Sequence, residues 1–275
     1  MTWEREESSS PDGRRVGRQS LLERLLDEAR SEVEARRSRM PQFHLERLAR
    51  ALPPPRLFRS ALRGDRLAVI AEMKARTPVM GTLSEDYVPG RLAAGYAAAG
   101  AAALSVLCQE TSFGGLPEHL AEARAVTGLP ILRKDFVVDE YQVIEARAFG
   151  ADAVLLIVAG ATEERLRELL EAVRRTGMDA LVEVKDEAEV EVALRLEADL
   201  VGVNQRDLRT FEVDRGRLAR LRPLLRPEVV CVAESGIHSA EDAQRVRQAG
   251  ADAILVGEAL MRASDPAASI RELVV

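Results

Sequence analysis

Gly-Ala-Asp-Ala-Val-Leu-Leu at residues 150–156 returns as Gly-Ala-Asp-Ala-Ile-Leu-Val at residues 250–256. Looser copies lie at 100–106 and 197–203, so the pattern recurs about every fifty residues. In the two close copies the glycine can end a preceding helix with a left-handed cap, and the apolar residues after it begin a strand. About fifty residues hold two strand–helix units, so the copies predict every second strand of a repeating βα chain.

Apolar runs near Val69, Ile131, Leu181 and Val230 predict the strands between these copies. Strand–helix alternation with buried apolar runs indicates a parallel sheet, and eight repeats favour a closed sheet over an open one. The 275 residues are close to the roughly 250 that are typical of one (β/α)8 barrel. We therefore expect a (β/α)8 TIM barrel over residues 67–275, with helices near 85–99, 117–126, 139–149, 162–176, 186–196, 214–221, 239–249 and 267–273.

Residues 21–66 predict an N-terminal helical extension that could cap one end of the barrel. Leucines at helical spacing, after a sequence typical of a capping box, indicate an amphipathic helix from Leu21 to Met40. A short second helix is expected at about 45–51, before a run of three prolines. Residues 1–20 are polar and charged and lack the apolar segment of a secretory signal, so we expect a disordered tail.

Composition argues against several functional classes. The net charge of −6 and the pI near 5.4 disfavour nucleic-acid binding, which normally needs a basic surface. No apolar run approaches the roughly 18 residues of a membrane span. Cys108 and Cys231 match no zinc or redox spacing, so we expect reduced thiols, a cytoplasmic location and no metal site. No nucleotide-binding motif is present, so no cofactor is expected, and the oligomeric state stays open between monomer and weak dimer.

Five of the predicted strands end in charged or amide side chains. Glu72 and Lys74 are two residues apart on the first strand and therefore share one face. Because such a barrel carries its chemistry at the carboxyl ends of its strands, we expect a ring of catalytic groups there. Lysines and glutamates in one pocket could hold an anionic small molecule and exchange protons, if burial lowers a lysine pKa or raises a glutamate pKa. Rim ion pairs without a chemical role are the alternative. The candidates are Glu72, Lys74, Lys134, Glu183, Asn204 and Glu234.

Short polar turns, each with a glycine, follow the seventh and eighth predicted strands. The corresponding loops of (β/α)8 barrels often bind a phosphate through backbone N–H groups, which glycine lets approach closely. Two phenylalanines follow other strands, and in a chain with 4% aromatic residues they could form a wall against a flat ligand. Ordinary turn and packing roles are the alternatives. The candidates are Ser235, Gly236, Gly257 and Glu258 for phosphate, and Phe113 and Phe136 for a ring.

A set of motifs resembles the indole-3-glycerol phosphate synthase family. The first predicted strand carries Glu-Met-Lys-Ala-Arg-Thr-Pro-Val at 72–79, where the family has Glu-x-Lys-x-x-Ser-Pro-Ser. Pro-Ile-Leu-Arg-Lys-Asp-Phe stands intact at 130–136. The resemblance covers about residue 20 to the C-terminus. The other matches are Leu-Ser-Val-Leu at 104–107, Phe-Gly-Gly at 113–115, Leu-Val-Glu-Val at 181–184, Asn-Gln-Arg-Asp-Leu at 204–208, Val-Ala-Glu-Ser-Gly-Ile at 232–237 and Leu-Val-Gly-Glu-Ala-Leu-Met at 255–261.

The resemblance implies a carboxy-lyase of tryptophan biosynthesis that needs no cofactor. Its substrate would be 1-(2-carboxyphenylamino)-1-deoxyribulose 5-phosphate, which undergoes ring closure, decarboxylation and dehydration. The resemblance also implies that Lys134 protonates the ketone oxygen, that Lys74 holds a substrate anion or acts as acid in the dehydration, and that Glu183 is the general base. Which lysine serves which step stays open. The remaining implied roles are orientation of the lysines and sugar hydroxyls for Glu72 and Glu234, a hydroxyl contact for Asn204, ring contacts for Phe113 and Phe136, and substrate or phosphate binding for Thr77, Arg206, Ser235, Gly236, Gly257 and Glu258.

Several loop positions depart from the family pattern. Thr77, Val79 and Leu116 replace serines, with Thr77 keeping a hydroxyl, and Cys108-Gln109 replaces threonine followed by an acidic residue. All follow the first two strands, over the expected ring end of the pocket, so a modified anthranilate in a side pathway is an alternative substrate. A phosphosugar isomerase is disfavoured because its usual Cys or Asp pair is missing from the matching strand ends. A non-catalytic phosphometabolite-binding barrel is a further alternative. Such a protein would be expected to have lost Lys134 or Glu183, and both residues are present.

Overall fold

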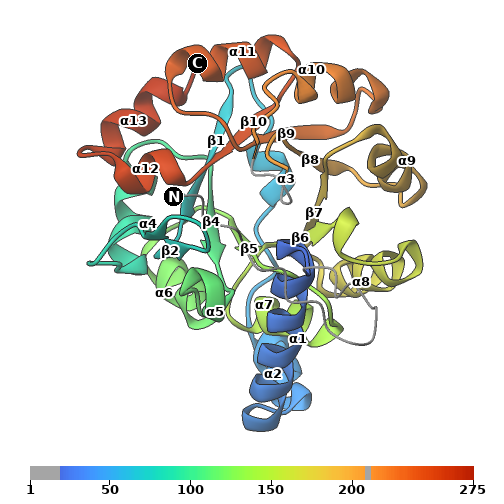
Figure 1. Cartoon of the computed structure of the whole chain (residues 1–275). Helices are drawn as coiled ribbons and strands as arrows, with labels where there is room; N and C mark the ends of the chain where they lie inside the picture. The colour runs from blue at the N-terminus through green and yellow to red at the C-terminus, as the bar shows by residue number, and fades with distance from the viewer. Residues whose placement is uncertain (1–18, 208–211) are drawn as a thin grey trace, which may run out of the picture.

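Parallel strands alternate with helices and close into a barrel in the computed structural model, which describes residues 19–207 and 212–275 (Figure 1). The predicted (β/α)8 TIM barrel is therefore confirmed. The strands of the closed sheet are β1 (Ala68–Met73), β4 (Ala103–Leu107), β5 (Ile131–Lys134), β6 (Ala153–Ile157), β7 (Asp179–Val184), β8 (Leu200–Asn204), β9 (Val230–Glu234) and β10 (Ala253–Val256).

Neighbouring barrel strands are also neighbours in the chain, as βαβ connections require. The sheet closes because β1 pairs with both β4 and β10, with Ala68 opposite Ala253. The four copies of the repeated heptapeptide begin β4, β6, β8 and β10, as predicted.

Helices form an outer ring around the strands (Figure 1). The predicted ones are present with ends shifted by a few residues, as α4 (Pro89–Ala98), α6 (Glu118–Val126), α7 (Glu140–Ala148), α8 (Glu163–Thr176), α9 (Glu187–Arg195), α10 (Arg217–Leu221), α11 (Ala240–Gln248) and α13 (Pro266–Leu273). The elements without a prediction are very short, and a segment of one turn has no helical periodicity to detect. They are β2 (Arg76–Thr77), β3 (Gly81–Thr82), α5 (Glu110–Phe113), α12 (Glu258–Arg262) and the 3₁₀ turns η1 (Val158–Gly160) and η2 (Arg222–Leu224).

The N-terminal segment forms α1 (Leu21–Arg39), α2 (Gln42–Ala51) and α3 (Phe58–Ala61) before the first strand. The capping box at the start of α1 is present, with Ser20 and Glu23 side chains satisfying each other's backbone N–H groups. α1 and α2 pack against α7, on the outside of the barrel (Figure 1). Most of the predicted disordered tail at residues 1–20 lies outside the described residues.

Alternation along each strand sends every second side chain into the barrel. On β1, Ile70 belongs to an inner cluster, whereas Val69 and Ala71 belong to the outer cluster that packs against the helices. Glu72 lies two residues beyond Ile70 and therefore also points inward. The inner apolar cluster is continued on other strands by Ala103, Leu132, Ala153, Leu155, Leu181, Leu200, Val230, Val232, Ala253 and Leu255.

Phe58 and Leu62 close the end of the barrel where the strands begin. Both are fully buried and pack into the inner apolar cluster. The end of the extension therefore forms the floor of the barrel interior, while the charged strand ends lie at the opposite mouth.

We expect Phe58→Ala to lower the free energy of unfolding by about 3–5 kcal/mol, because it opens a cavity in a packed floor. Denaturant unfolding monitored by circular dichroism measures the change. Phe43→Ala is the matched control, since the Phe43 side chain is 61% exposed on α2 and should change stability little. Equal losses for both variants would contradict the assignment of Phe58 to the floor.

Candidate active site

The charged strand ends predicted from the sequence meet at the mouth of the barrel. Lys134, Asn204 and Glu234 are the last residues of β5, β8 and β9. Glu72 and Glu183 are the second last residues of β1 and β7. These side chains line one cavity, and so does every other residue that the sequence marked for binding: Lys74, Thr77, Phe113, Phe136, Arg206, Ser235, Gly236, Gly257 and Glu258. Their chemical roles remain predictions.

Lys134 is the centre of a buried ion-pair network. Its Nζ lies 2.5 Å from Glu234 Oε2 and 3.1 Å from Glu183 Oε2. The Asn204 amide donates to Glu183 Oε1 at 3.2 Å, which holds the second oxygen of that carboxylate. A separate pair joins Lys74 Nζ to Glu72 Oε1 at 2.6 Å. The mouth therefore holds two lysines and three glutamates, which form one set around Lys134 and a second set made of Lys74 and Glu72.

Burial and neighbouring charges move three of these groups away from their usual pKa values. Burial opposes the charge of Lys134, but the surrounding carboxylates outweigh it and raise the pKa of the ammonium. Burial would also raise the pKa of Glu183, but Lys134 and the Asn204 amide together hold it below its usual value. Burial raises the pKa of Glu234 to about 8, with Lys134 opposing the rise and Glu183 adding to it. The cluster therefore favours a charged lysine and an ionised Glu183, and Glu234 is the carboxyl that takes up a proton more readily.

These directions differ from the sequence expectation of a lysine pKa lowered by burial and a base whose pKa is raised. The expectation counted burial but not the number of carboxylates that would face Lys134. The raised carboxyl pKa belongs to Glu234, which lies beside another carboxylate and has one buried oxygen, Oε1, without a hydrogen-bond partner in the structure.

Two glycines make room for the carboxylates. A Cβ atom on Gly202, in β8, would overlap Glu234 Oε1, and one on Gly257, after β10, would overlap Glu72 Oε1. Both positions therefore need glycine for side-chain space, and neither has a left-handed backbone. The carboxylates can lie close to the strands because their neighbours carry no side chain.

The turn after β9 has an unusual backbone. Ser235 has φ of +67° and Gly236 has φ of +71°, so two consecutive residues are left-handed. Ser235 is one of few non-glycine residues with positive φ, a conformation that costs about 1–3 kcal/mol and is held by surrounding contacts. The Ser235 hydroxyl donates to Asn204 Oδ1 at 2.9 Å, and buried Gln205 donates to the Ser235 carbonyl at 2.8 Å. The nearby Gly257 is the N-cap of α12, so both predicted phosphate turns border the cavity.

An apolar wall occupies the opposite side of the cavity. The Phe113 and Phe136 rings lie 6.2 Å apart between centroids, at an interplanar angle of 37°. Leu21 and Leu25 of α1 join this wall and line the cavity. Sequence analysis missed these two leucines, because helical periodicity identifies an apolar face without identifying its partner.

The small number of lysines is a further signal in the sequence. The chain contains three lysines, Lys74, Lys134 and Lys185, among 39 basic residues. Two of the three lie in the cavity. Arginine stays protonated in proteins, whereas lysine can transfer a proton, so the placement favours proton chemistry at the mouth.

Thr77 and Val79 are the variant loop residues that line the cavity, and Val79 is 60% exposed. Cys108 is buried in the outer apolar cluster, and the Leu116 backbone N–H donates to His119 Nδ1 at the start of α6. The expectation that all the variant positions lie over the ring end is therefore wrong for Cys108, Gln109 and Leu116, which do not line the cavity.

Searches of the described residues give two negative findings. Among them, no cluster of three or more His, Cys, Asp or Glu side chains has the geometry to hold a metal ion. No helix within residues 19–207 and 212–275 has the length and apolar character needed to cross a membrane.

Comparisons with known proteins agree with the geometry. A family model described as indole-3-glycerol phosphate synthase matches residues 22–273. Indole-3-glycerol phosphate synthase 2 of Streptomyces coelicolor is 55% identical over 254 residues, which are 92% of this chain and 98% of that protein. Indole-3-glycerol phosphate synthase of Parafrankia sp. is 47% identical over 255 residues, covering 93% of this chain and 95% of that protein.

Solved structures at low identity share the barrel. N-acetylmannosamine-6-phosphate 2-epimerase from Clostridium perfringens has a TM-score of 0.60 at 18% identity, covering 76% of this chain and 93% of its own. Orotidine 5'-phosphate decarboxylase from Pyrococcus horikoshii has a TM-score of 0.57 at 17% identity, covering 74% and 96%. At such identities the likeness shows the fold alone.

We expect Glu234→Gln to remove a pH dependence of stability. Because the folded pKa of Glu234 is about 8, above that of an unfolded chain, folding takes up a proton at intermediate pH. The wild type should therefore lose stability relative to the variant as pH rises from about 5 to about 8, by at most about 1.4 kcal/mol per pH unit. Thermal unfolding across this range measures the difference. Glu272→Gln on the exposed surface of α13 is the control, and parallel curves for wild type and Glu234→Gln would contradict the raised pKa.

Proposed function

The chain belongs to the indole-3-glycerol phosphate synthase family, and we propose that the barrel mouth carries out the family's ring closure on 1-(2-carboxyphenylamino)-1-deoxyribulose 5-phosphate. The ring carbon that bears the carboxylate attacks the ribulose ketone, and loss of carbon dioxide and then water yields indole-3-glycerol phosphate. Membership of the family makes the protein a carboxy-lyase of tryptophan biosynthesis.

The observation that carries the assignment of roles is Lys134 held between Glu183 and Glu234 beside an apolar wall. Ring closure needs a proton donor at the ketone oxygen, and the later loss of water needs a proton acceptor for the methylene carbon beside the nitrogen. A lysine with a raised pKa is fully protonated at neutral pH and can donate to the oxygen as negative charge develops. A glutamate with a lowered pKa is ionised and available as a base. We therefore assign the acid to Lys134 and the base to Glu183.

Lys74 supplies a second positive charge at the mouth, after β1. Paired with Glu72, it can hold the substrate carboxylate or phosphate and serve as acid in the dehydration. Glu72 and Glu234 orient the two lysines and the sugar hydroxyls in this proposal. Asn204 is held by hydrogen bonds to Glu183 and Ser235, and in this proposal it forms a hydrogen bond with a substrate hydroxyl.

The remaining cavity residues divide between the two ends of the substrate. The left-handed turn after β9 presents consecutive backbone N–H groups, a geometry that favours anions, so we place the phosphate there. Arg206 lies at this end, 3.7 Å from Glu258, and contributes positive charge. The anthranilate ring lies against Phe113 and Phe136. We assign contacts with the phosphate or with a substrate hydroxyl to the remaining residues, Thr77, Ser235, Gly236, Gly257 and Glu258.

The overall conversion is redox-neutral, since it loses carbon dioxide and water and transfers only protons. The proposal therefore calls for no cofactor. We place the enzyme in the cytoplasm, where a reducing environment suits the two buried free cysteines.

We expect purified protein to produce indole fluorescence from the carboxyphenylamino substrate, and Lys134→Ala to lower kcat by about 10²–10⁴-fold, the usual contribution of a general acid. Lys185→Ala is the matched control, because Lys185 pairs with Glu189 outside the cavity. It should retain kcat within about twofold.

A wild-type protein that binds the substrate without forming indole would contradict the proposed function. Equal losses for the two lysine variants would contradict the role of Lys134, and leave the reaction itself standing.

A further inference from the structure

We propose that Gln109 is a positioning residue for ring recognition: it fastens α1 to α5 and thereby holds Phe113 in the apolar wall of the cavity. The identity of the ring rests on the proposed function, whereas the connection between the two helices rests on contacts in the structure. Gln109 does not line the cavity and touches no reacting group.

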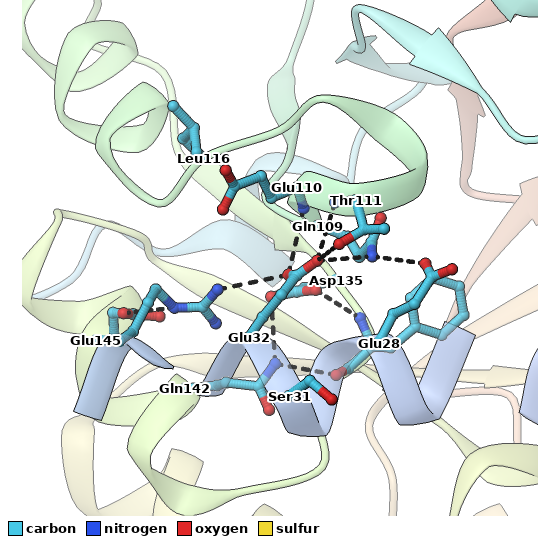
Figure 2. A network of polar contacts seen from close by, with 12 residues as sticks. Glu28, Ser31, Glu32, Gln109, Glu110, Thr111, Leu116, Asp135, Gln142 and Glu145 are labelled. Carbon is cyan, nitrogen blue, oxygen red and sulfur yellow. Dashed lines mark hydrogen bonds and ion pairs between the residues drawn. The ribbon is translucent and has the colours of Figure 1, made fainter. Parts of the chain in front are cut away.

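The buried Gln109 amide contacts two glutamates of α1 through its nitrogen (Figure 2), and its oxygen is also hydrogen-bonded. Its Nε2 donates to Glu28 Oε2 at 3.0 Å and to Glu32 Oε1 at 2.9 Å, both on α1. Its Oε1 accepts from the backbone N–H groups of Ser112 and Phe113, at 2.8 and 3.2 Å. The reverse orientation would place an oxygen against two carboxylates, so the surroundings determine the amide orientation.

The same two glutamates bind the rest of α5 (Figure 2). Glu32 Oε1 accepts from the Thr111 N–H at 2.9 Å and from its hydroxyl at 2.7 Å. The Ser112 hydroxyl donates to Glu28 Oε2 at 2.7 Å. A helix of four residues cannot satisfy its own N–H groups, so α5 depends on these outside acceptors.

The opposite side of α5 is held by the loop after β1. Arg76, in β2, donates to the carbonyl oxygens of Glu110 and Thr111 at 3.0 and 2.8 Å. α5 is therefore bound through its N–H groups by α1 and through its carbonyl groups by the loop that carries Thr77. Phe113 is the last residue of this small helix, and its ring packs in one cluster with Leu25 and Phe136.

Position 109 specifically requires an amide. A glutamate there would keep the acceptor for the α5 N–H groups but would face Glu28 and Glu32 as a third carboxylate. Arg36, 3.5 Å from Glu32, already pairs with Glu145 at 3.0 Å, so a further carboxylate would add negative charge without adding a cation. A glutamate at this position should therefore loosen the contact between α1 and α5, and with it the apolar wall, while leaving the charged strand ends of the cavity in place.

We expect Gln109→Glu in the full-length protein to raise KM for the carboxyphenylamino substrate about tenfold, with kcat within about threefold of wild type. Loosening a wall that binds the ring equally in ground and transition states changes KM alone. The double variant Gln109→Glu, Glu28→Gln places a donor opposite the new carboxylate, since the Ser112 hydroxyl can accept as well as donate, and it should recover part of the loss in KM. Glu32 is kept because its Oε1 also accepts from Thr111. Glu28→Ala provides a second, milder break of the same contact if Gln109→Glu does not fold. Glu34→Ala, on the exposed face of α1, is the matched control.

Hydrogen exchange supplies a readout that needs no turnover. In Gln109→Glu the backbone amides of residues 110–113 should exchange faster, and those of β5 should be unchanged. The proposal is overturned if KM and exchange at 110–113 both match wild type, if kcat falls while KM stays, or if the double variant does not lower KM below that of Gln109→Glu. Altered exchange in a protein whose wild type lacks turnover would reject the proposed function and keep the α1–α5 connection.

Discussion

The site depends on the ammonium group of Lys134 and the two carboxylates that it separates. Glu183 lies near the end of β7 and Glu234 ends β9, with β8 between them in the closed sheet. Burial of both charges without a cation would cost several kcal/mol. Lys134 makes this arrangement stable, and Gly202 leaves the space that it requires. Lys134 lowers the pKa of both carboxyls, whereas their contact with each other and the Asn204 amide set the two pKa values apart, Glu183 below and Glu234 above its usual value. Structural stability and acid–base function therefore depend on one cluster of side chains.

The barrel could be predicted because its signals are periodic. The heptapeptide at 150–156 and its copies located alternate strands, and the residue ending each strand could then be assigned to one mouth. The directions of the pKa shifts could not be predicted, because they depend on how many carboxylates lie around Lys134 in space. One-turn helices such as α5 also lack a periodic signal, although α5 carries Phe113.

The extension shows a different limit of sequence analysis. Its apolar spacing identified α1 as a helix, yet the partners of α1 are loops and helices far along the chain. The departure at Cys108-Gln109 was visible in the sequence and was assigned to the cavity. In the structure Gln109 instead binds α1 and does not line the cavity. A substitution at this loop position therefore affects the helices behind the cavity wall and not the cavity surface itself.

The position of α1 in the chain affects the order in which the molecule can assemble. Glu28 and Gln109 are 81 residues apart, and Arg36 and Glu145 are 109 residues apart. During synthesis on the ribosome α1 emerges before the barrel strands, and its leucine face has no partner until Phe113 and Phe136 have been made. The barrel itself cannot close until β10 reaches β1. Such non-local contacts slow folding and leave apolar surface exposed in the nascent chain. The helix that completes the cavity wall therefore spends part of synthesis with its apolar face exposed to solvent.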